Sequence, residues 1–198
     1  MRLLSALDAV LLELISQKDF VQQAKDNIEL LGLKESCKVI HGDARRLDFE
    51  KESFDVIIIE AMLAMLSKEE RARALSDYYD LLKPGGYLLT QDVIVKSKDS
   101  ELIGDLSTTV NKQVDPETYL GLQTSLIQTG LEIRYCKSDR VRFIFPDGLI
   151  ADEGAIHAAE VISRGQEPEN IKQFEAIKSF FTEHADKLRY VCFISQKI

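Results

Sequence analysis

Three short apolar runs punctuate the first half of the chain, at Cys37–Ile40, Phe54–Ile59 and Tyr87–Val95. Each run is too short for an independent helix. The second run contains four consecutive apolar residues, Val56–Ile59, with no polar alternation. Such a strand is typical of the interior of a parallel sheet, where both faces of the strand are covered. The pattern therefore predicts three strands, and we expect both faces of the second strand to be buried.

The segment Ser67–Leu82 connects the second and third runs and has helical periodicity. Its first residues, SKEE, form a capping box in which Ser67 is the N-cap and Glu70 bonds back to it. Pro84 and the two glycines after it end the helix and turn the chain into the next strand. A helix between two buried strands is a βαβ unit. Such units build doubly wound, Rossmann-like sheets with helices on both faces.

The rest of the chain is predicted from the same signals. Helices are expected at 19–31, 115–128, 151–163 and 170–186, and strands at 131–136, 141–145 and 188–195. Gly32 and Gly130 end the first two helices, and Asp115 is expected to cap the second of them, with Pro116 in its first turn. The polar stretch 96–108 is predicted to be a loop at the carboxyl edge of the sheet. Residues 2–15 fit a helix, and also a short strand near 11–14.

Composition limits the classes of partner. The chain has 198 residues, 45% of them hydrophobic and 29% charged, and a net charge of −8. An acidic surface repels nucleic-acid backbones, and the arginines 71 and 73 and the lysines 96 and 98 are interpreted as solvated faces rather than a basic patch. No apolar run approaches the roughly 20 residues of a membrane span. No clean cleavage site follows the first residues, so we expect no signal peptide.

The three cysteines, Cys37, Cys136 and Cys192, lie within apolar runs and form no C-x-x-C pair. We interpret them as buried thiols in a reducing compartment, which predicts a cytoplasmic protein. His157 lies near Asp152, Glu153 and Glu160 on a predicted helix, but carboxylates at helical spacing are usually a solvated face. The sequence therefore predicts no metal site.

Three segments carry a resemblance to a known family. HGDARRLDF, SFDVIIIEAML and LLKPGGYLLTQDV, in this order and spacing, resemble the class I S-adenosylmethionine-dependent methyltransferases. The similarity is strongest to the small-molecule group with the motifs GDA-x-x-L-x-F, FD-x-x-x-x-E and LKPGG. It covers residues 17–95 well and the C-terminal half more loosely. It implies one methyltransferase-like domain over 1–198, with a cofactor-binding start at 1–36, core βαβ motifs at 37–95, and substrate-side elements at 96–198. The resemblance also implies that these C-terminal elements end in an antiparallel hairpin, with the last strand beside the fifth strand of the family's sheet.

The resemblance also assigns roles to particular residues. It implies that Asp43 accepts a hydrogen bond from the adenine amino group of S-adenosylmethionine, and that the Ala44 amide donates to the ring. Glu60 ends an apolar strand and is a candidate contact to the cofactor's amino group or to the substrate, with a cap or salt bridge as the structural alternative. Asp92 is a weaker substrate candidate, and Glu13 is the acid nearest the family's ribose position. Catalytic residues are not predicted, because methyl transfer from a sulfonium depends mainly on positioning.

The chain departs from the family pattern in one respect. The family has a glycine-rich loop after its first strand, whereas the first glycine here is Gly32. We therefore expect the first strand and loop to be incomplete, and these residues alone to bind S-adenosylmethionine weakly or not at all. Because of this, a non-catalytic binding or assembly module is the alternative to a methyltransferase acting on a small molecule.

A second alternative comes from Tyr79 and Lys83, which have the Y-x-x-x-K spacing of the short-chain dehydrogenases. That spacing would indicate a nicotinamide-dependent oxidoreductase. The pair lies at the very end of a predicted helix, however, and the dinucleotide glycine loop is absent. The expectation remains a cytoplasmic methyltransferase with no nucleic-acid or membrane partner. The acceptor and the oligomeric state are not predicted.

Overall fold

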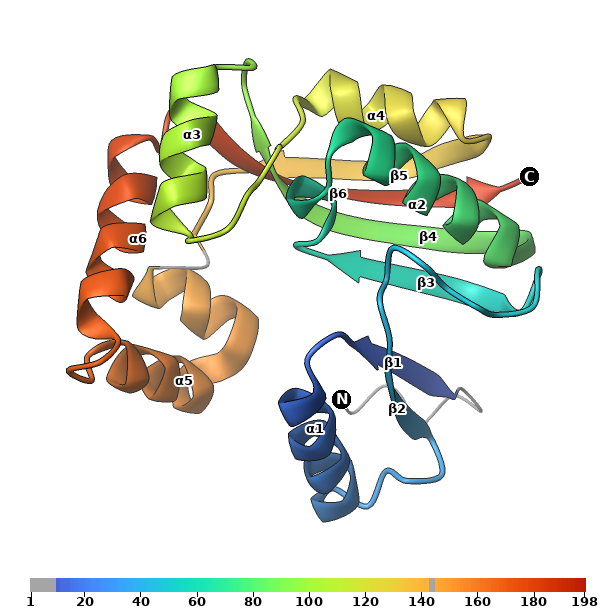
Figure 1. Ribbon diagram of the computed structural model, residues 1–198, viewed down its shortest axis with the longest axis horizontal. Helices are drawn as coiled ribbons and strands as arrows, with labels where there is room; N and C mark the ends of the chain where they lie inside the picture. Colours follow the sequence, from blue (N-terminus) through green and yellow to red (C-terminus); the bar gives the residue numbers. More distant parts are fainter. Residues whose placement is uncertain (1–9, 143–144) are drawn as a thin grey trace. The chain divides into compact units, whose positions relative to one another are not determined.

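The computed structural model describes residues 10–142 and 145–198. It divides into two compact units, residues 1–49 and residues 50–198, and each unit is described by itself. Each unit has its own sheet, with two strands in the first unit and four in the second (Figure 1).

The first unit is a single βαβ motif. Strand β1 (Leu11–Ile15) is followed by helix α1 (Lys18–Leu30) and strand β2 (Cys37–His41). The two strands are parallel, and Leu11 pairs with Cys37. The prediction of a short strand near 11–14 is confirmed, while residues 1–9 lie outside the described part. Gly32 has φ 67°, the left-handed conformation expected of a residue that ends a helix.

The second unit is built on a sheet with the order β3–β4–β6–β5. These strands are β3 (Phe54–Glu60), β4 (Leu82–Val95), β5 (Leu131–Asp139) and β6 (Leu188–Lys197). β3 and β4 are parallel, whereas β6 is antiparallel to both of its neighbours. The predicted antiparallel pairing at the C-terminus is therefore confirmed, and the last strand lies beside β4.

Helices connect these strands: η2 (Leu63–Met65), α2 (Lys68–Leu81), α3 (Ser100–Thr109), α4 (Tyr119–Gln128), α5 (Pro146–Gly165) and α6 (Ile171–Glu183). The predicted capping box is present, since Ser67 Oγ accepts from the Glu70 amide and Glu70 Oε2 accepts from the Ser67 amide. The C-terminal helices begin and end within a few residues of their predicted bounds, except that α5 starts earlier.

Three predictions about this unit are wrong. The stretch 96–108 is not only a loop, because Asp99 caps α3 and the helix buries Leu102 and Leu106 one turn apart. Asp115 does not cap a helix, since α4 begins at Tyr119 with Thr118 as its N-cap. Val141 and the residue after it lie outside any strand, because the chain leaves the sheet after Asp139 and enters α5.

The core of the second unit has two parts. On one face of the sheet, α2 and α4 bury a layer that includes Leu75, Leu88 and Phe193 (Figure 1). At the end of β4, helices α3 and α6 enclose a second cluster of buried residues: Val95, Leu102, Leu106, Val114, Val141, Phe180, Phe181 and Leu188. Both parts follow from apolar side chains at helical or alternating spacing.

The other face of the sheet contradicts the expectation that both faces of β3 are covered. Val56 is 47% exposed and Ile58 is 65% exposed, whereas Ile59, which faces the helices, is 6% exposed. The continuous apolar run correctly predicted a strand. It could not show which side the helices of this unit would cover.

Candidate functional site

Asp43 and Ala44 lie in the turn that follows β2, at the carboxyl end of the strand. The Asp43 carboxylate accepts hydrogen bonds from three donors of Arg45: the backbone N–H at 2.9 Å, Nε at 3.0 Å and Nη2 at 2.7 Å. Arg46 N closes the turn on the Asp43 carbonyl. The Arg45 side chain and amide hold the pKa of Asp43 below its usual value, so the group is ionised at neutral pH.

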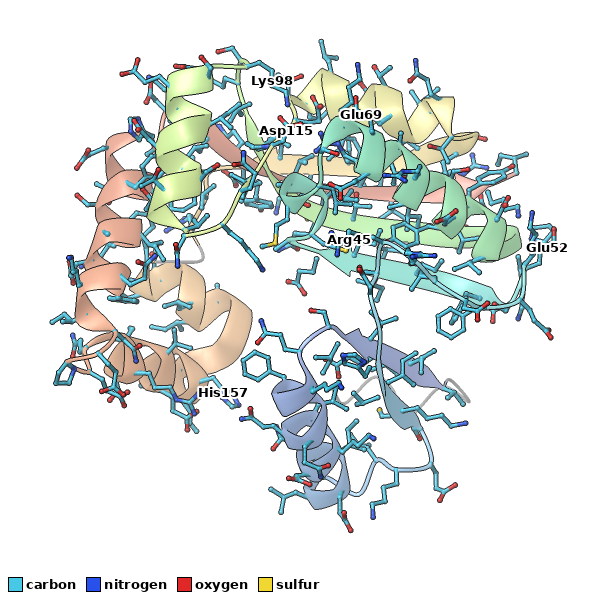
Figure 2. The ribbon with its side chains drawn as sticks, viewed as in Figure 1. Arg45, Glu52, Glu69, Lys98, Asp115 and His157 are labelled. Atoms are coloured by element: carbon cyan, nitrogen blue, oxygen red, sulfur yellow. The ribbon has the colours of Figure 1, made fainter. Side chains whose placement is uncertain are left out.

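This turn can still accept a ligand. Arg45 makes four hydrogen bonds to the two carboxylate oxygens, because its Nε is shared between Oδ1 and Oδ2, so a ligand amine would take the place of one of these contacts. The Asp43 side chain is 44% exposed and therefore accessible. Arg45 projects from the same turn (Figure 2). The arrangement fits the adenine end of the cofactor, whereas the glycine-rich turn expected at its methionine end does not occur before Gly32.

Gly42 precedes Asp43 and explains part of the GDA motif. A Cβ at this position would lie 2.9 Å from Leu14 Cδ1, so any side chain would displace Leu14 of β1. The Gly42 amide also donates to the Ile15 carbonyl oxygen at 3.1 Å. The glycine therefore allows the turn to approach the end of the neighbouring strand. Glu13 is exposed on β1.

Glu60 lies at the carboxyl end of β3, in the second unit, and is exposed. It stands beside Gln91 of β4, which in turn pairs with Cys192 of β6. Cys192 Sγ donates to Gln91 Oε1 at 3.4 Å. Ala61, the next residue after Glu60, adopts φ 51°, and its amide donates to the Gln91 carbonyl. A left-handed alanine is uncommon, and such strain often marks functional turns.

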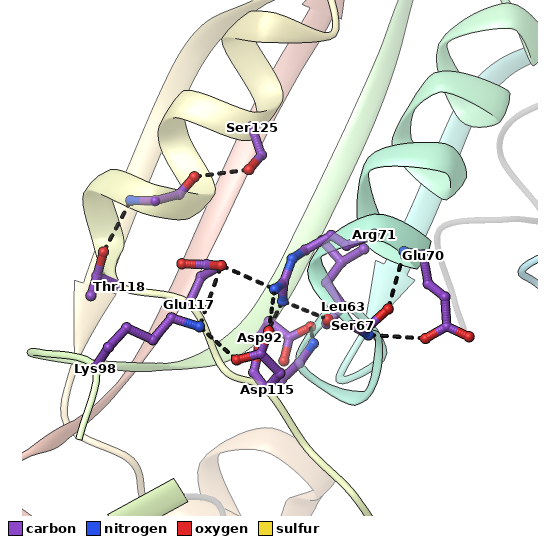
Figure 3. A network of polar contacts seen from close by, with 12 residues as sticks. Leu63, Ser67, Glu70, Arg71, Asp92, Lys98, Asp115, Glu117, Thr118 and Ser125 are labelled. Carbon is purple, nitrogen blue, oxygen red and sulfur yellow. Dashed lines mark hydrogen bonds and ion pairs between the residues drawn. The ribbon is translucent and has the colours of Figure 1, made fainter. Parts of the chain in front are cut away.

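Arg71 forms the centre of a buried polar network that sequence reasoning missed (Figure 3). It is only 2% exposed. Its Nη1 donates to the carbonyl oxygens of Leu63 and Asp115, and its Nη2 pairs with Asp115 Oδ2 at 3.1 Å and Glu117 Oε1 at 3.0 Å. Lys98 pairs with the same two carboxylates. The interpretation of Arg71 and Lys98 as solvated charges is thus wrong for Arg71, while Lys98 is 40% exposed.

The network ties together the segments that follow β3 and β4. The Ala64 amide donates to Asp92 Oδ2, and the Ala64 carbonyl accepts from the Asp115 amide. Burial raises the pKa of Asp92, although backbone donors around its carboxylate, at Ala64 first, offset part of this effect. Burial also raises the pKa of Asp115, but the Lys98 and Arg71 charges outweigh it and lower that pKa overall. A cleft of about 380 Å³ lies beside the network, lined by residues 65–70 and 113–115.

The remaining candidates from the sequence have structural partners. Lys83 pairs with Asp55 at 2.8 Å, and Lys197 lies over the Tyr79 ring at 4.6 Å, so each member of the Y-x-x-x-K pair has a contact that involves no ligand. His157 is 71% exposed and pairs with Glu160 (Figure 2). The side chains of Asp152 and Glu153 lie outside the described part of the structure, and the side chains that are described include no group of three or more His, Cys, Asp or Glu arranged to hold a metal ion.

The prediction of three buried thiols holds for Cys37 alone. Cys136 is exposed, with Sγ 3.0 Å from the Tyr119 hydroxyl, and Cys192 is half-buried. All three thiols are free. Among the helices of the described residues, none has the length and apolar character needed to cross a bilayer.

The protein is a Rossmann-like α/β protein with polar residues at the carboxyl ends of its strands. Three features define this class: the parallel β3–α2–β4 unit, the antiparallel end of the sheet and the acidic turn after β2. Comparison with known proteins then gives the family. A family model described as a methyltransferase domain matches residues 9–86. A Haemophilus influenzae protein described as uncharacterized is 34% identical over 176 residues, which cover 88% of this chain and 70% of the relative.

The comparisons also include a partial relative and two proteins of similar fold. A phthiotriol/phenolphthiotriol dimycocerosates methyltransferase from Mycobacterium ulcerans is 36% identical over 76 residues, 38% of this chain and 27% of that protein. Geranyl diphosphate C-methyltransferase from Streptomyces coelicolor has a TM-score of 0.72 at 8% identity, with coverage of 100% of this chain and 66% of its own. The [4+2]-cyclase SpnF has a TM-score of 0.73 at 19% identity, with coverage of 99% and 68%.

The chain belongs to the class I S-adenosylmethionine-dependent methyltransferase family. Its activity is that of a methyltransferase, with S-adenosylmethionine as the cofactor and methyl donor. The fold neighbours, all below 25% identity, contribute the fold alone. One of them is named a cyclase, so the fold does not by itself identify the reaction.

Proposed function

We propose that this methyltransferase binds the adenine end of S-adenosylmethionine at the turn after β2, through the Asp43 carboxylate and the Ala44 amide. The observation that carries the proposal is the accessible, ionised Asp43 carboxylate at the carboxyl end of β2. Glu60, in the other unit, is the proposed contact to the cofactor's amino group or to the acceptor. When bound, the cofactor supplies an activated methyl group, and the protein has to orient the acceptor and exclude water.

The acceptor side is proposed at the carboxyl ends of β3 and β4, where open α/β sheets bind ligands. The cleft beside the Arg71 network lies there. The network supports this role because it fixes η2 and the segment before α4 through bonds to both backbone and side chains. A rigid wall of this kind positions an acceptor without taking part in the chemistry.

Three further predictions complete the proposal. The single methyltransferase-like domain over residues 1–198 is supported by fold neighbours that match 99–100% of the chain, and so include both units. A cytoplasmic location is supported by three free thiols. With a net charge of −8, the chain is not expected to bind nucleic acid.

Calorimetric titration with S-adenosylhomocysteine tests the cofactor site. Because no glycine precedes Gly32, we expect weak binding and would titrate to millimolar ligand. Asp43→Ala should lose about 1.5–3 kcal/mol of binding free energy, the usual contribution of a hydrogen bond to a charged group. That is a weakening of about tenfold to over a hundredfold. Asp26→Ala is the matched control, since Asp26 is an exposed acid of the same unit that accepts a hydrogen bond from Gln22 within α1.

Three results are distinguishable in this experiment. Saturable binding that weakens in Asp43→Ala and persists in Asp26→Ala supports the assignment. Equal affinities for the wild type and Asp43→Ala refute the adenine contact. A wild-type chain that shows no saturation at millimolar ligand supports the non-catalytic binding module instead.

A further inference from the structure

Asp92 of β4 is a buried acid that takes no part in the proposed binding of cofactor or acceptor. The residue is 4% exposed, which leaves little of its carboxylate accessible to an acceptor. A buried carboxylate is costly unless hydrogen-bond donors satisfy it. The donors around Asp92 therefore indicate what this side chain does.

These donors are backbone amides of two segments. Oδ1 of Asp92 accepts from the Val93 amide at 2.9 Å, and Oδ2 accepts from the Ala64 amide at 3.1 Å. The Leu63 amide also interacts with the carboxylate. Two of these three amides belong to η2, the short helix that follows β3 in the chain (Figure 3). The carboxylate of β4 therefore holds the turn through which the chain leaves β3.

The same turn contains a strained residue. Ala61 has φ 51°, a conformation that residues other than glycine rarely adopt. Such strain persists only where the surrounding structure imposes it. The Ala61 amide donates to the Gln91 carbonyl oxygen at 2.8 Å, and three residues later Asp92 holds the Ala64 amide. Two consecutive residues of β4 thus fix the turn at both of its ends.

The charged groups next to Asp92 support the same turn. Arg71 of α2 donates to the Leu63 carbonyl oxygen, and its positive charge favours the ionised form of the Asp92 carboxyl. The Asp115 amide donates to the Ala64 carbonyl oxygen at 2.7 Å, while the Asp115 side chain pairs with Arg71. These groups bind the carbonyl oxygens of η2, whereas Asp92 supplies the acceptor for its amides.

The turn matters for the site because Glu60 comes directly before Ala61, as the last residue of β3. The direction of the Glu60 side chain depends on how the backbone turns immediately after it. We propose that Asp92 is a positioning residue, whose carboxylate keeps Ala61 in its left-handed conformation and so directs Glu60 toward the ligand. This inference rests on the proposed contact of Glu60 with the cofactor or the acceptor. Asp92 acts through the backbone of η2 and does not touch the ligand.

Amide hydrogen exchange, followed by NMR on the protein without ligand, tests how the turn is held. Asp92→Ala should raise the exchange rates of the Ala64 and Ala61 amides by roughly tenfold or more, although Ala61 does not bond to Asp92. Asp92→Leu, which keeps approximately the shape of the side chain, should have the same effect and serves where Asp92→Ala folds poorly. Asp77→Ala is the matched control, since Asp77 is an exposed acid of α2, and it should leave both rates unchanged.

A second substitution separates positioning from a general loosening of the fold. Glycine adopts positive φ without strain, so Ala61→Gly added to Asp92→Ala should return the exchange rate of the residue-61 amide to within about threefold of the wild type. A general loosening would not be reversed in this way. An Ala61 amide that exchanges at the wild-type rate in both Asp92→Ala and Asp92→Leu overturns the proposal. Failure of Ala61→Gly to restore slow exchange also overturns it.

Calorimetric titration with S-adenosylhomocysteine distinguishes this inference from the proposed function. If Glu60 contacts the cofactor, Glu60→Gln and Asp92→Ala should weaken binding by similar factors, and the double variant Asp92→Ala/Ala61→Gly should recover the wild-type affinity. Unchanged affinity in Glu60→Gln refutes the cofactor contact of Glu60. The exchange measurement needs no ligand, so it decides the role of Asp92 in the turn in either case.

Discussion

The guanidinium of Arg71 allows a quantitative test of how the carboxyl edge of the second unit is held together. It is almost completely buried and bonds two carbonyl oxygens and two carboxylates. Arg71→Met removes these bonds and fills much of the space. Removing one partner of a buried ion pair costs roughly 3–5 kcal/mol. Asp115 and Glu117 keep Lys98 and some contact with solvent, so we expect a loss near the lower end, about 3 kcal/mol.

Urea unfolding followed by circular dichroism measures this loss. A domain has a total stability of about 5–15 kcal/mol, so the midpoint should fall clearly while the slope of the transition stays constant. Arg73→Met is the matched control, because Arg73 is exposed on the same helix. Its free energy of unfolding should change by less than about 0.5 kcal/mol. Equal losses in the two variants would refute the argument that the buried network stabilises this unit.

Three further substitutions test packing and ionisation. A Cβ on Gly121 would overlap the Glu117 carboxylate, so Gly121→Ala should lower the free energy of unfolding by about 1 kcal/mol. At Gly104 a Cβ meets nothing within 4 Å, so Gly104→Ala should raise the free energy of unfolding by about 0.5–1 kcal/mol. Changes of the same sign for the two variants in urea unfolding would contradict this reasoning. Burial raises the pKa of Asp92 in the folded chain, so the wild type is stabilised by protonation and loses that stability as pH rises through the raised pKa. Asp92→Asn should therefore gain stability relative to the wild type as the pH rises from the usual aspartate value, 3.8, through the raised pKa. A difference independent of pH in the same assay would show that Asp92 does not titrate in this way.

Elements governed by neighbours in the chain could be predicted from the sequence. The capping box at Ser67 and Glu70 forms as expected because both of its hydrogen bonds span three residues. Gly32 and Gly130 have positive φ because a left-handed residue after a helix needs no distant partner. The three motifs likewise indicated the family, and they placed Asp43 and Glu60 at the carboxyl ends of strands.

Long-range contacts decided what the sequence left open. Arg71 and Arg73 are two residues apart in one polar helix, yet only Arg71 is buried, since the segment around Asp115 crosses its side of the helix. Asp115 has the local pattern of a helix cap, but its interaction with Arg71 and Lys98 prevails and α4 begins four residues later. The apolar run of β3 predicts a strand, but burial of its two faces depends on which other segments pack there. Such contacts join residues tens of positions apart, and local spacing contains no information about them.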